Sequence, residues 1–134
     1  ERVNIMTEVA RCIGPAADTR DGEYALAPCI QMGSFNAMEG LHEYELSAWY
    51  AKWRLPRLSK LDGTLAVRKL VSVAGWAKHA ILYEFISTDA RNQKFVDHES
   101  DNPEMEQWTD DVVRLLDHAP GSPNLAKRIW PPIS

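Results

Sequence analysis

The chain has 134 residues, of which 45% are hydrophobic and 25% are charged, with a formal net charge of −4 and a pI of about 5.5. These values fit one globular domain and argue against a nucleic-acid partner, because binding to phosphates needs a basic surface. No apolar run is long enough for a membrane span, and two cysteines make neither a disulfide framework nor a metal site, so we expect free thiols, no membrane partner and a cytoplasmic location.

The first 27 residues predict a helix and a linker ahead of the main domain. Four apolar side chains share one face at helical spacing: Val3, Met6, Ala10 and Ile13. Gly14-Pro15 would end this helix near residue 13. The stretch also follows the pattern of residues 110–119, which raises the hypothesis that 1–27 is the end of a preceding, similar half. The alternative is that any amphipathic helix before a turn gives such a pattern.

Residues 28–134 predict one domain of strands and helices. Pro28 precedes the first strand, because a proline cannot donate to the ladder and so sits at a strand start or an edge. The first helix presents an apolar face made of Leu46, Trp49, Tyr50 and Trp53. Pro56 should end that helix. Asn102 followed by Pro103 is typical of the start of the last helix. The predicted strands are 29–35, 64–73, 77–87 and 125–130, and the predicted helices are 41–55, 88–99 and 102–119.

This order of strand, helix, strand, strand, helix, strand is the βαββαβ arrangement of ferredoxin-like α+β folds. It predicts a four-stranded antiparallel sheet with helices on one face. Apolar residues occur on both faces of strands 64–73 and 77–87. Because one layer of helices cannot bury both faces, we expect a homodimer that forms through the open face.

Two segments carry a resemblance to a known family. Trp49-Tyr50, followed after three residues by Arg54-Leu55-Pro56, resembles the EthD-like branch of the dimeric α/β-barrel superfamily, in which a Trp-Tyr pair precedes His-x-Pro. Residues 76–85 (WAKHAILYEF) resemble the third strand of that family, and residues 118–132 resemble its fungal members. The resemblance covers about residues 36–131. It implies a subunit whose sheet packs against the sheet of a partner, with a pocket between sheet and helices.

The superfamily includes polyketide cyclases, decarboxylases, hydroxynitrile lyases, monooxygenases, haem-dependent enzymes and proteins without a known activity, so the fold does not select a reaction. One departure bears on the chemistry: Arg54 stands where the family pattern has a histidine. Arginine stays charged and cannot act as a base. The chemistry of that position is therefore lost or carried by another residue, and Arg54 could bind a carboxylate or stabilise an enolate.

His79 and Tyr83 are the candidate catalytic residues, because they lie two positions of one strand face apart and could form an acid/base pair. The alternative for His79 is a structural histidine. The candidate substrate-binding residues are Trp49, Tyr50, Trp53 and Arg54, with core packing as the alternative for the three aromatic residues.

Other polar residues have structural interpretations. Glu84 points to the opposite strand face and should pair with Arg68. The His98-Glu99 pair, with Asp101, lacks a recognised metal-ligand spacing, so we expect a solvated helix end. His118 is expected to be exposed in a loop.

The sequence therefore predicts a cofactor-independent enzyme that acts by proton transfer on an aromatic or polyketide-like substrate, as a cyclase, a decarboxylase or another lyase. Its ligand would be small and aromatic or anionic. The alternative is a non-catalytic dimeric protein of the same fold, with a ligand-binding or structural role. A haem-binding protein is a third possibility.

Overall fold

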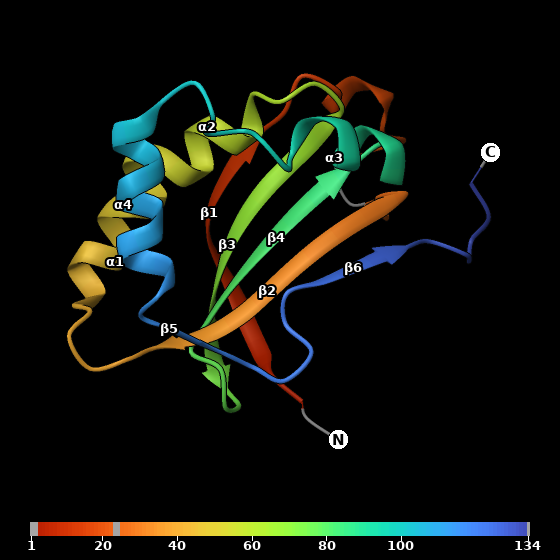
Figure 1. Ribbon diagram of the computed structural model, residues 1–134. Helices are drawn as coiled ribbons and strands as arrows, with labels where there is room; N and C mark the ends of the chain where they lie inside the picture. The colour runs from red at the N-terminus through yellow and green to blue at the C-terminus, as the bar shows by residue number, and fades with distance from the viewer. Residues whose placement is uncertain (1–2, 23–24, 134) are drawn as a thin grey trace.

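Six strands form one sheet in the described part of this computed structural model, residues 3–22 and 25–133 (Figure 1). They are β1 (Ile5–Ile13), β2 (Cys29–Ala37), β3 (Thr64–Ala74), β4 (His79–Phe85), β5 (Leu116–His118) and β6 (Asn124–Lys127). The strand order is β1-β3-β4-β2-β5, and β6 pairs with another part of β2. Each of these pairs is antiparallel.

The helical segments are a short 3-10 turn η1 (Ala17–Thr19), α1 (Glu43–Trp49), a π-helical segment η2 (Tyr50–Arg54), α2 (Leu55–Ser59), α3 (Thr88–Lys94) and α4 (Pro103–Val113). Figure 1 shows α1, α2 and α4 together on one side of the sheet, with α3 at the end of β4. The α+β class is thereby confirmed. Within the described ranges, every helix is too short or too polar to cross a membrane.

The prediction of a four-stranded sheet is wrong in two places. The strand β5 forms where the end of the last helix is predicted, and it pairs with one end of β2, whereas β6, the last predicted strand, pairs with the other end. In addition, β1 extends the sheet as an outer strand beside β3. From β2 to β6 the elements still follow the predicted order, so the core of the sheet is loosely ferredoxin-like.

The helix predicted over residues 1–13 is wrong, because residues 5–13 form β1. Its pairing with β3 is irregular after Ile5 and after Glu8. Such irregularities interrupt the two-residue alternation of a strand, so the apolar side chains fall at spacings that mimic a helix. The pattern shared with residues 110–119 is therefore not a shared structure, since residues 110–113 belong to α4.

The helix predicted over residues 41–55 has the expected position but continues further. In η2 the backbone N–H of Leu55 donates to the carbonyl of Tyr50, which is the i to i+5 pattern of a π-helix. The chain then continues as α2, so the prediction that Pro56 ends the helix is wrong. Pro56 lies in the first turn of α2, where a missing amide hydrogen is tolerated.

The last helix begins as predicted and ends early. The side chain of Asn102 accepts a hydrogen bond from the backbone N–H of Met105, and α4 stops at Val113. The next residues form β5 because the end of β2 offers them backbone partners. The predicted helix over 88–99 is confirmed for its first part, α3. The four strands predicted over 29–35, 64–73, 77–87 and 125–130 are confirmed as β2, β3, β4 and a shorter β6.

The hydrophobic core lies between the helices and the sheet. Alternate residues of β2 face the helices and are buried, from Cys29 to Phe35. They pack with buried side chains of the helices, which include Leu46, Trp49 and Val112. Both cysteines are free thiols, with Cys29 buried and Cys12 partly buried. The opposite face of the sheet carries half-buried apolar side chains: Ile30, Met32, Leu70 and Leu82.

Candidate functional site

A cavity of about 300 Å³ lies between the helix-facing side of the sheet and the helices. Five aromatic rings contribute to its lining: Phe35, Trp49, Tyr50, Tyr83 and Phe95. Gly33 helps to leave this space open, because it lies opposite Ile81 on β4 and adds no side chain beside it. The cavity is thus apolar on most sides, as expected for a small-molecule site.

Local structure explains which side chains reach the cavity. Tyr83 faces it because β4 alternates, and its register partners Gln31 and Val67 share the same sheet face. Tyr50 and Arg54 are the first and last residues of η2, and both line the cavity. The π-helical turn therefore supplies two polar groups to the cavity.

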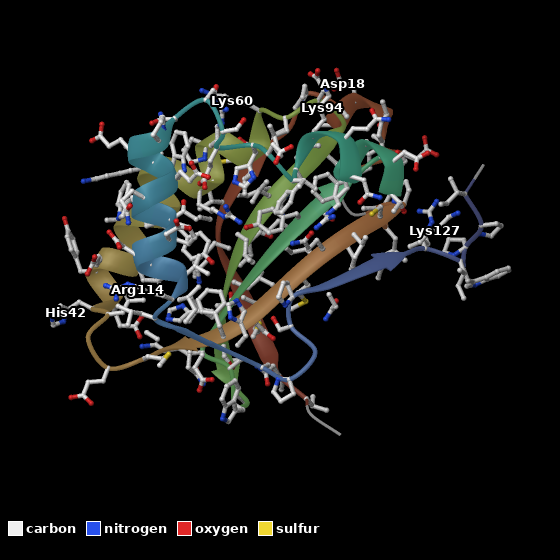
Figure 2. The ribbon with its side chains drawn as sticks, viewed as in Figure 1. Asp18, His42, Lys60, Lys94, Arg114 and Lys127 are labelled. Carbon is white, nitrogen blue, oxygen red and sulfur yellow. The ribbon has the colours of Figure 1, made fainter. Side chains whose placement is uncertain are left out.

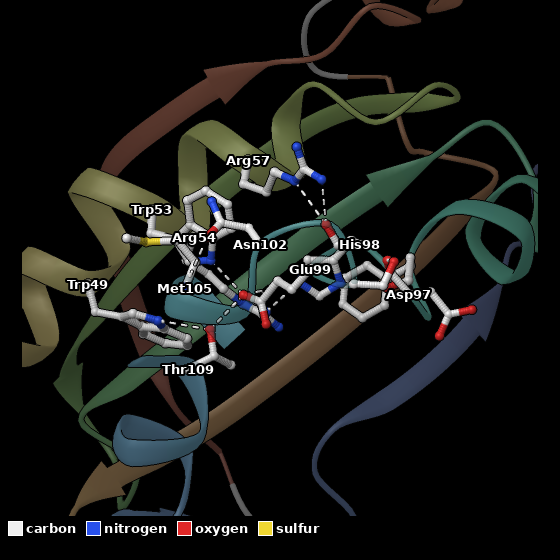
Figure 3. Close-up of polar contacts among 12 residues, drawn as sticks. Trp49, Trp53, Arg54, Arg57, Asp97, His98, Glu99, Asn102, Met105 and Thr109 are labelled. Carbon is white, nitrogen blue, oxygen red and sulfur yellow. Dashed lines mark hydrogen bonds and ion pairs between the residues drawn. The ribbon is translucent and has the colours of Figure 1, made fainter. Parts of the chain in front are cut away.

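Arg54 is held in place by partners from three parts of the chain: α1, β4 and the turn that follows α3. Its Nε donates to the hydroxyl of Tyr83 at 3.1 Å. Its Nη1 donates to His98 Nε2 at 2.8 Å (Figure 3). Its guanidinium also lies over the rings of Trp49, Tyr83 and Phe95, at 5.3 to 5.8 Å from the ring centroids. A cation packed against aromatic faces is stabilised by their quadrupoles. Arg54 is consequently a fixed positive charge at the edge of the cavity.

His98 and Glu99 support Arg54, so the expectation of a solvated helix end is wrong. His98 Nδ1 donates to the carbonyl of Phe95 at 2.6 Å, which leaves Nε2 as the acceptor for Arg54. Burial, together with the charge of Arg54, lowers the pKa of His98. Glu99 is buried and lies 3.8 Å from Arg54 Nη1. The imidazole is therefore neutral near pH 7 and serves as a hydrogen-bond acceptor.

Glu99 also connects the first helix to α4. Its Oε1 accepts hydrogen bonds from Trp53 Nε1 at 2.6 Å and from the hydroxyl of Thr109 at 2.5 Å (Figure 3). The same hydroxyl accepts from Trp49 Nε1 at 3.2 Å. Trp53 thus binds a structural carboxylate and does not line the cavity, although the sequence places it among the substrate-binding residues.

Two tyrosine hydroxyls face the cavity near Arg54. The Tyr83 hydroxyl accepts from Arg54 and keeps its own hydrogen available for a ligand. Tyr50 is 3% exposed, and its hydroxyl makes no hydrogen bond within the described residues. Burial raises the pKa of Tyr50 well above its usual value, and it also raises that of Tyr83 despite the opposing charge of Arg54. Both hydroxyls therefore stay protonated and can donate to an oxygen in the cavity.

His79 lies outside the cavity. Lys69 Nζ donates to its Nδ1 at 3.0 Å, and its Nε2 donates to Glu43 at 2.7 Å. Its ring stacks on Phe35, with the centroids 5.6 Å apart. Burial and the charge of Lys69 lower the pKa of His79. The acid/base pair of His79 with Tyr83 is therefore not assembled, because both imidazole nitrogens are engaged by other residues.

Of the six candidate residues, the structure brings four together at the cavity: Trp49, Tyr50, Arg54 and Tyr83. His118 joins them, although the sequence predicts an exposed loop position. It lies on β5 opposite Phe35, is half-buried, and its ring lies 5.7 Å from that of Phe35. By contrast, His42 is exposed at the start of α1 and lies at the outer edge of the molecule (Figure 2).

The remaining charged candidates are structural. Glu84 pairs with Arg68 at 2.9 Å on the far face of the sheet, as predicted, and also with Arg20 at 2.8 Å. Within residues 3–22 and 25–133, no three His, Cys, Asp or Glu side chains are placed to hold a metal ion. His98 instead accepts a hydrogen bond from Arg54, and Glu99 accepts one from Trp53.

The fold and this site define a small α+β domain with an aromatic cavity whose polar groups converge on one end. Family models, curated proteins and solved structures contain no match to the chain. The resemblance to the EthD-like family thus stays a prediction from Trp49-Tyr50 and the strand around Tyr83. What the site can do follows from its own chemistry.

Proposed function

We propose that the chain is a cofactor-independent enzyme of the EthD-like type that acts by proton transfer on a small aromatic or polyketide-like acid. The hydroxyl of Tyr50 carries this proposal, because its residue is buried, lines the cavity and has no hydrogen-bond partner for this hydroxyl in the described residues. A hydroxyl without a protein partner is free to donate a hydrogen bond to a ligand oxygen in the cavity.

The polar end of the cavity suits an oxygen that gains negative charge. The hydroxyls of Tyr50 and Tyr83 are available to donate hydrogen bonds, and Arg54 adds a fixed positive charge beside them. Preorganised donors in a site without water stabilise an enolate or a carboxylate strongly. Cyclisation and decarboxylation both pass through such an enolate when the reacting carbon lies next to a carbonyl group. The same donors would therefore serve either reaction.

The size of the cavity limits the substrate. A volume of about 300 Å³ is near the lower end of the range of ligand sites, roughly 300–1,000 Å³. Trp49 and Phe95 supply flat apolar surfaces for a ring. We infer a substrate of one or two rings, or a short polyketide-like chain of that size, with its acidic group toward Arg54.

A homodimer that forms through the open sheet face is part of the same proposal. Half-buried apolar residues, which include Met32, Leu70 and Leu82, lie on that face, and a surface hollow of about 530 Å³ is lined by Met6, Met32 and Leu70. Sedimentation velocity should give a dimer for the wild type and a monomer for Leu82→Lys. A monomeric wild type would contradict this part of the proposal.

The non-catalytic alternative is supported by one observation. Tyr50 and Tyr83 can donate hydrogen bonds to a ligand, Arg54 supplies positive charge, and none of the three is a base near neutral pH. These three residues would make a binding site without turnover. The alternative is favoured if aromatic acids bind tightly and no chemical change follows.

Calorimetric titration with benzoate and with benzyl alcohol tests the binding step. Benzoate should bind more tightly, because only its carboxylate can use Arg54 and both hydroxyls. Tyr50→Phe should weaken benzoate binding by about tenfold, which corresponds to one hydrogen bond of about 1.4 kcal/mol. The matched control is Tyr44→Phe on the same helix, whose residue is 81% exposed. Equal affinity for the acid and the alcohol, or no binding of either, would refute the proposal.

A further inference from the structure

His118 differs from the other two buried or half-buried histidines in its hydrogen bonding. Both ring nitrogens of His79 are engaged, by Lys69 and Glu43, and both ring nitrogens of His98 are engaged as well. Among residues 3–22 and 25–133, neither ring nitrogen of His118 has a hydrogen-bond partner, although the ring lines the cavity. An imidazole in that state can accept a proton from a bound molecule.

The position of His118 relative to the donors follows from Phe35. The Phe35 ring stacks on the Tyr50 ring with the centroids 6.1 Å apart. It also contacts the His118 ring, with the centroids 5.7 Å apart. Tyr50 and His118 therefore contact the same ring, and both line the cavity. A ligand that lies against Phe35 would have donors near its oxygen and an imidazole near a neighbouring carbon atom.

We infer that His118 is the proton acceptor of this cavity for substrates with an enolisable carbonyl group, an inference that rests on the proposed function. The C–H bond next to the carbonyl breaks, and its proton moves to a ring nitrogen of His118. The electron pair forms a carbon–carbon double bond, and the carbonyl π electrons move to the oxygen. Tyr50 and Tyr83 hold that oxygen as an enolate, beside the positive charge of Arg54. Return of the proton from His118 regenerates the imidazole.

Aryl-substituted 2-oxo acids are the class of ligand that uses every group. Their carboxylate suits Arg54, their keto oxygen suits the tyrosine hydroxyls, and their ring suits the aromatic walls. Phenylpyruvate is the smallest practical probe of this class, because its acidic CH₂ group lies between the ring and the keto carbon. Proton abstraction then appears as exchange of these hydrogens for deuterium.

The experiment follows phenylpyruvate in D₂O by proton NMR with the wild type, His118→Gln, His118→Asn, Tyr50→Phe and His42→Gln. Broadening of the ring signals reports binding, and loss of the CH₂ signal above the buffer rate reports proton transfer. We expect the two His118 variants to bind phenylpyruvate and to lose at least about 100-fold in protein-dependent exchange, as is typical for the loss of a general base. His42→Gln, at an exposed helix start, should behave like the wild type.

The outcomes distinguish a failure of the role of His118 from a failure of the proposed function. Binding with exchange that survives in both His118 variants would overturn the role of His118 and leave the proposed function in place. Binding to the wild type without exchange would also overturn the role of His118, and it would favour the non-catalytic alternative. Binding that is absent in the wild type would overturn the proposed function, and His118 with it. The supporting result has two parts. Tyr50→Phe alone weakens binding, and the two His118 variants bind phenylpyruvate but lose the exchange.

Discussion

Phe35 contacts two regions of the molecule, each with one histidine, that differ in chemistry. His79 stacks on the Phe35 ring, and His118 meets the same ring in a tilted arrangement at a nearly equal distance. The His79 side is closed, since Lys69 and Glu43 bind both nitrogens, whereas the His118 side opens into the cavity. A buried titratable residue whose polar atoms are all engaged stabilises structure, and one with free polar atoms beside a cavity can bind or react.

The region around His79 contains a buried charged group, Lys69. Lys69 is 7% exposed, and burial lowers its pKa to about 8. Its ammonium group lies over the Tyr50 ring at 5.3 Å and donates to the carbonyl of Leu70 at 2.9 Å. These contacts offset part of the desolvation. The region around His79 and the region around His118 thus differ in stability as well as in reactivity. Four measurements can test that difference.

The largest expected effect is on Phe35 itself. Phe35→Ala should lower the free energy of unfolding by about 3–5 kcal/mol, because the ring is 1% exposed and packs against both regions. Urea denaturation measures this change. Tyr44→Ala is the matched control and should cost under about 0.5 kcal/mol, as its side chain is 81% exposed. A loss below about 1 kcal/mol for Phe35→Ala would mean that the ring does not join the two regions.

Lys69→Met should raise the free energy of unfolding by about 2 kcal/mol at pH 7. The unfolded lysine has a pKa near 10.4, so below pH 8 the native state holds a buried charge that the unfolded state holds in water. Between pH 8 and about 10.4 the native state releases this proton first, and wild-type stability should rise toward that of the variant. Denaturation at pH 7 and at pH 10 measures both values. Lys60→Met, on an exposed residue (Figure 2), should show no such change with pH.

His79 should make stability fall by about 1 kcal/mol as the pH drops below about 6.5. Its native pKa is lowered, so the unfolded state takes up the proton first and is favoured by acid. His98 has the same sign, and it should keep part of the dependence. Thermal unfolding from pH 7 to pH 4.5 should therefore give a shallower slope for His79→Gln than for the wild type. An unchanged slope would show that His79 is not buried as a neutral imidazole.

The smallest effect is expected on the open side. Tyr50→Phe should leave the free energy of unfolding within about 0.5 kcal/mol of the wild type, since the hydroxyl that it removes has no partner in the described residues. Chemical denaturation of the free protein is the measurement. A loss above about 1 kcal/mol would show that the hydroxyl is satisfied in the free protein, which would remove the main support for ligand binding.

Local patterns predicted most of the fold. The strands β2, β3 and β4, the first helix and the start of α4 all follow from hydrophobic periodicity and capping residues, which depend on near neighbours in the chain. The strand β1 does not, because its irregular pairing disrupts the alternation on which recognition depends. The strand β5 does not either, since three residues carry no period and become extended only because β2 has a free edge.

The candidate site was also predictable only where its residues are near neighbours in the chain. Trp49, Tyr50 and Arg54 lie within two turns of one helix, so their common face could be inferred from spacing. For β4, alternation gave the face of His79 and Tyr83 but not the position of the cavity along the strand, which covers Tyr83 and not His79. His118 carried no signal, because its place depends on a strand pairing across about 80 residues of sequence.

The π-helical segment makes the cavity sensitive to chain length. A π-turn accommodates one residue more than an α-helix of the same rise, and each residue of an α-helix turns the chain by about 100°. Deletion of Ala51, which is exposed, would let η2 become an ordinary helix and would rotate Tyr50 and α1 relative to Arg54. A single deletion, with every side chain of the site retained, would thereby dismantle it. The spacing between Tyr50 and Arg54 is as much a part of the site as the two residues themselves.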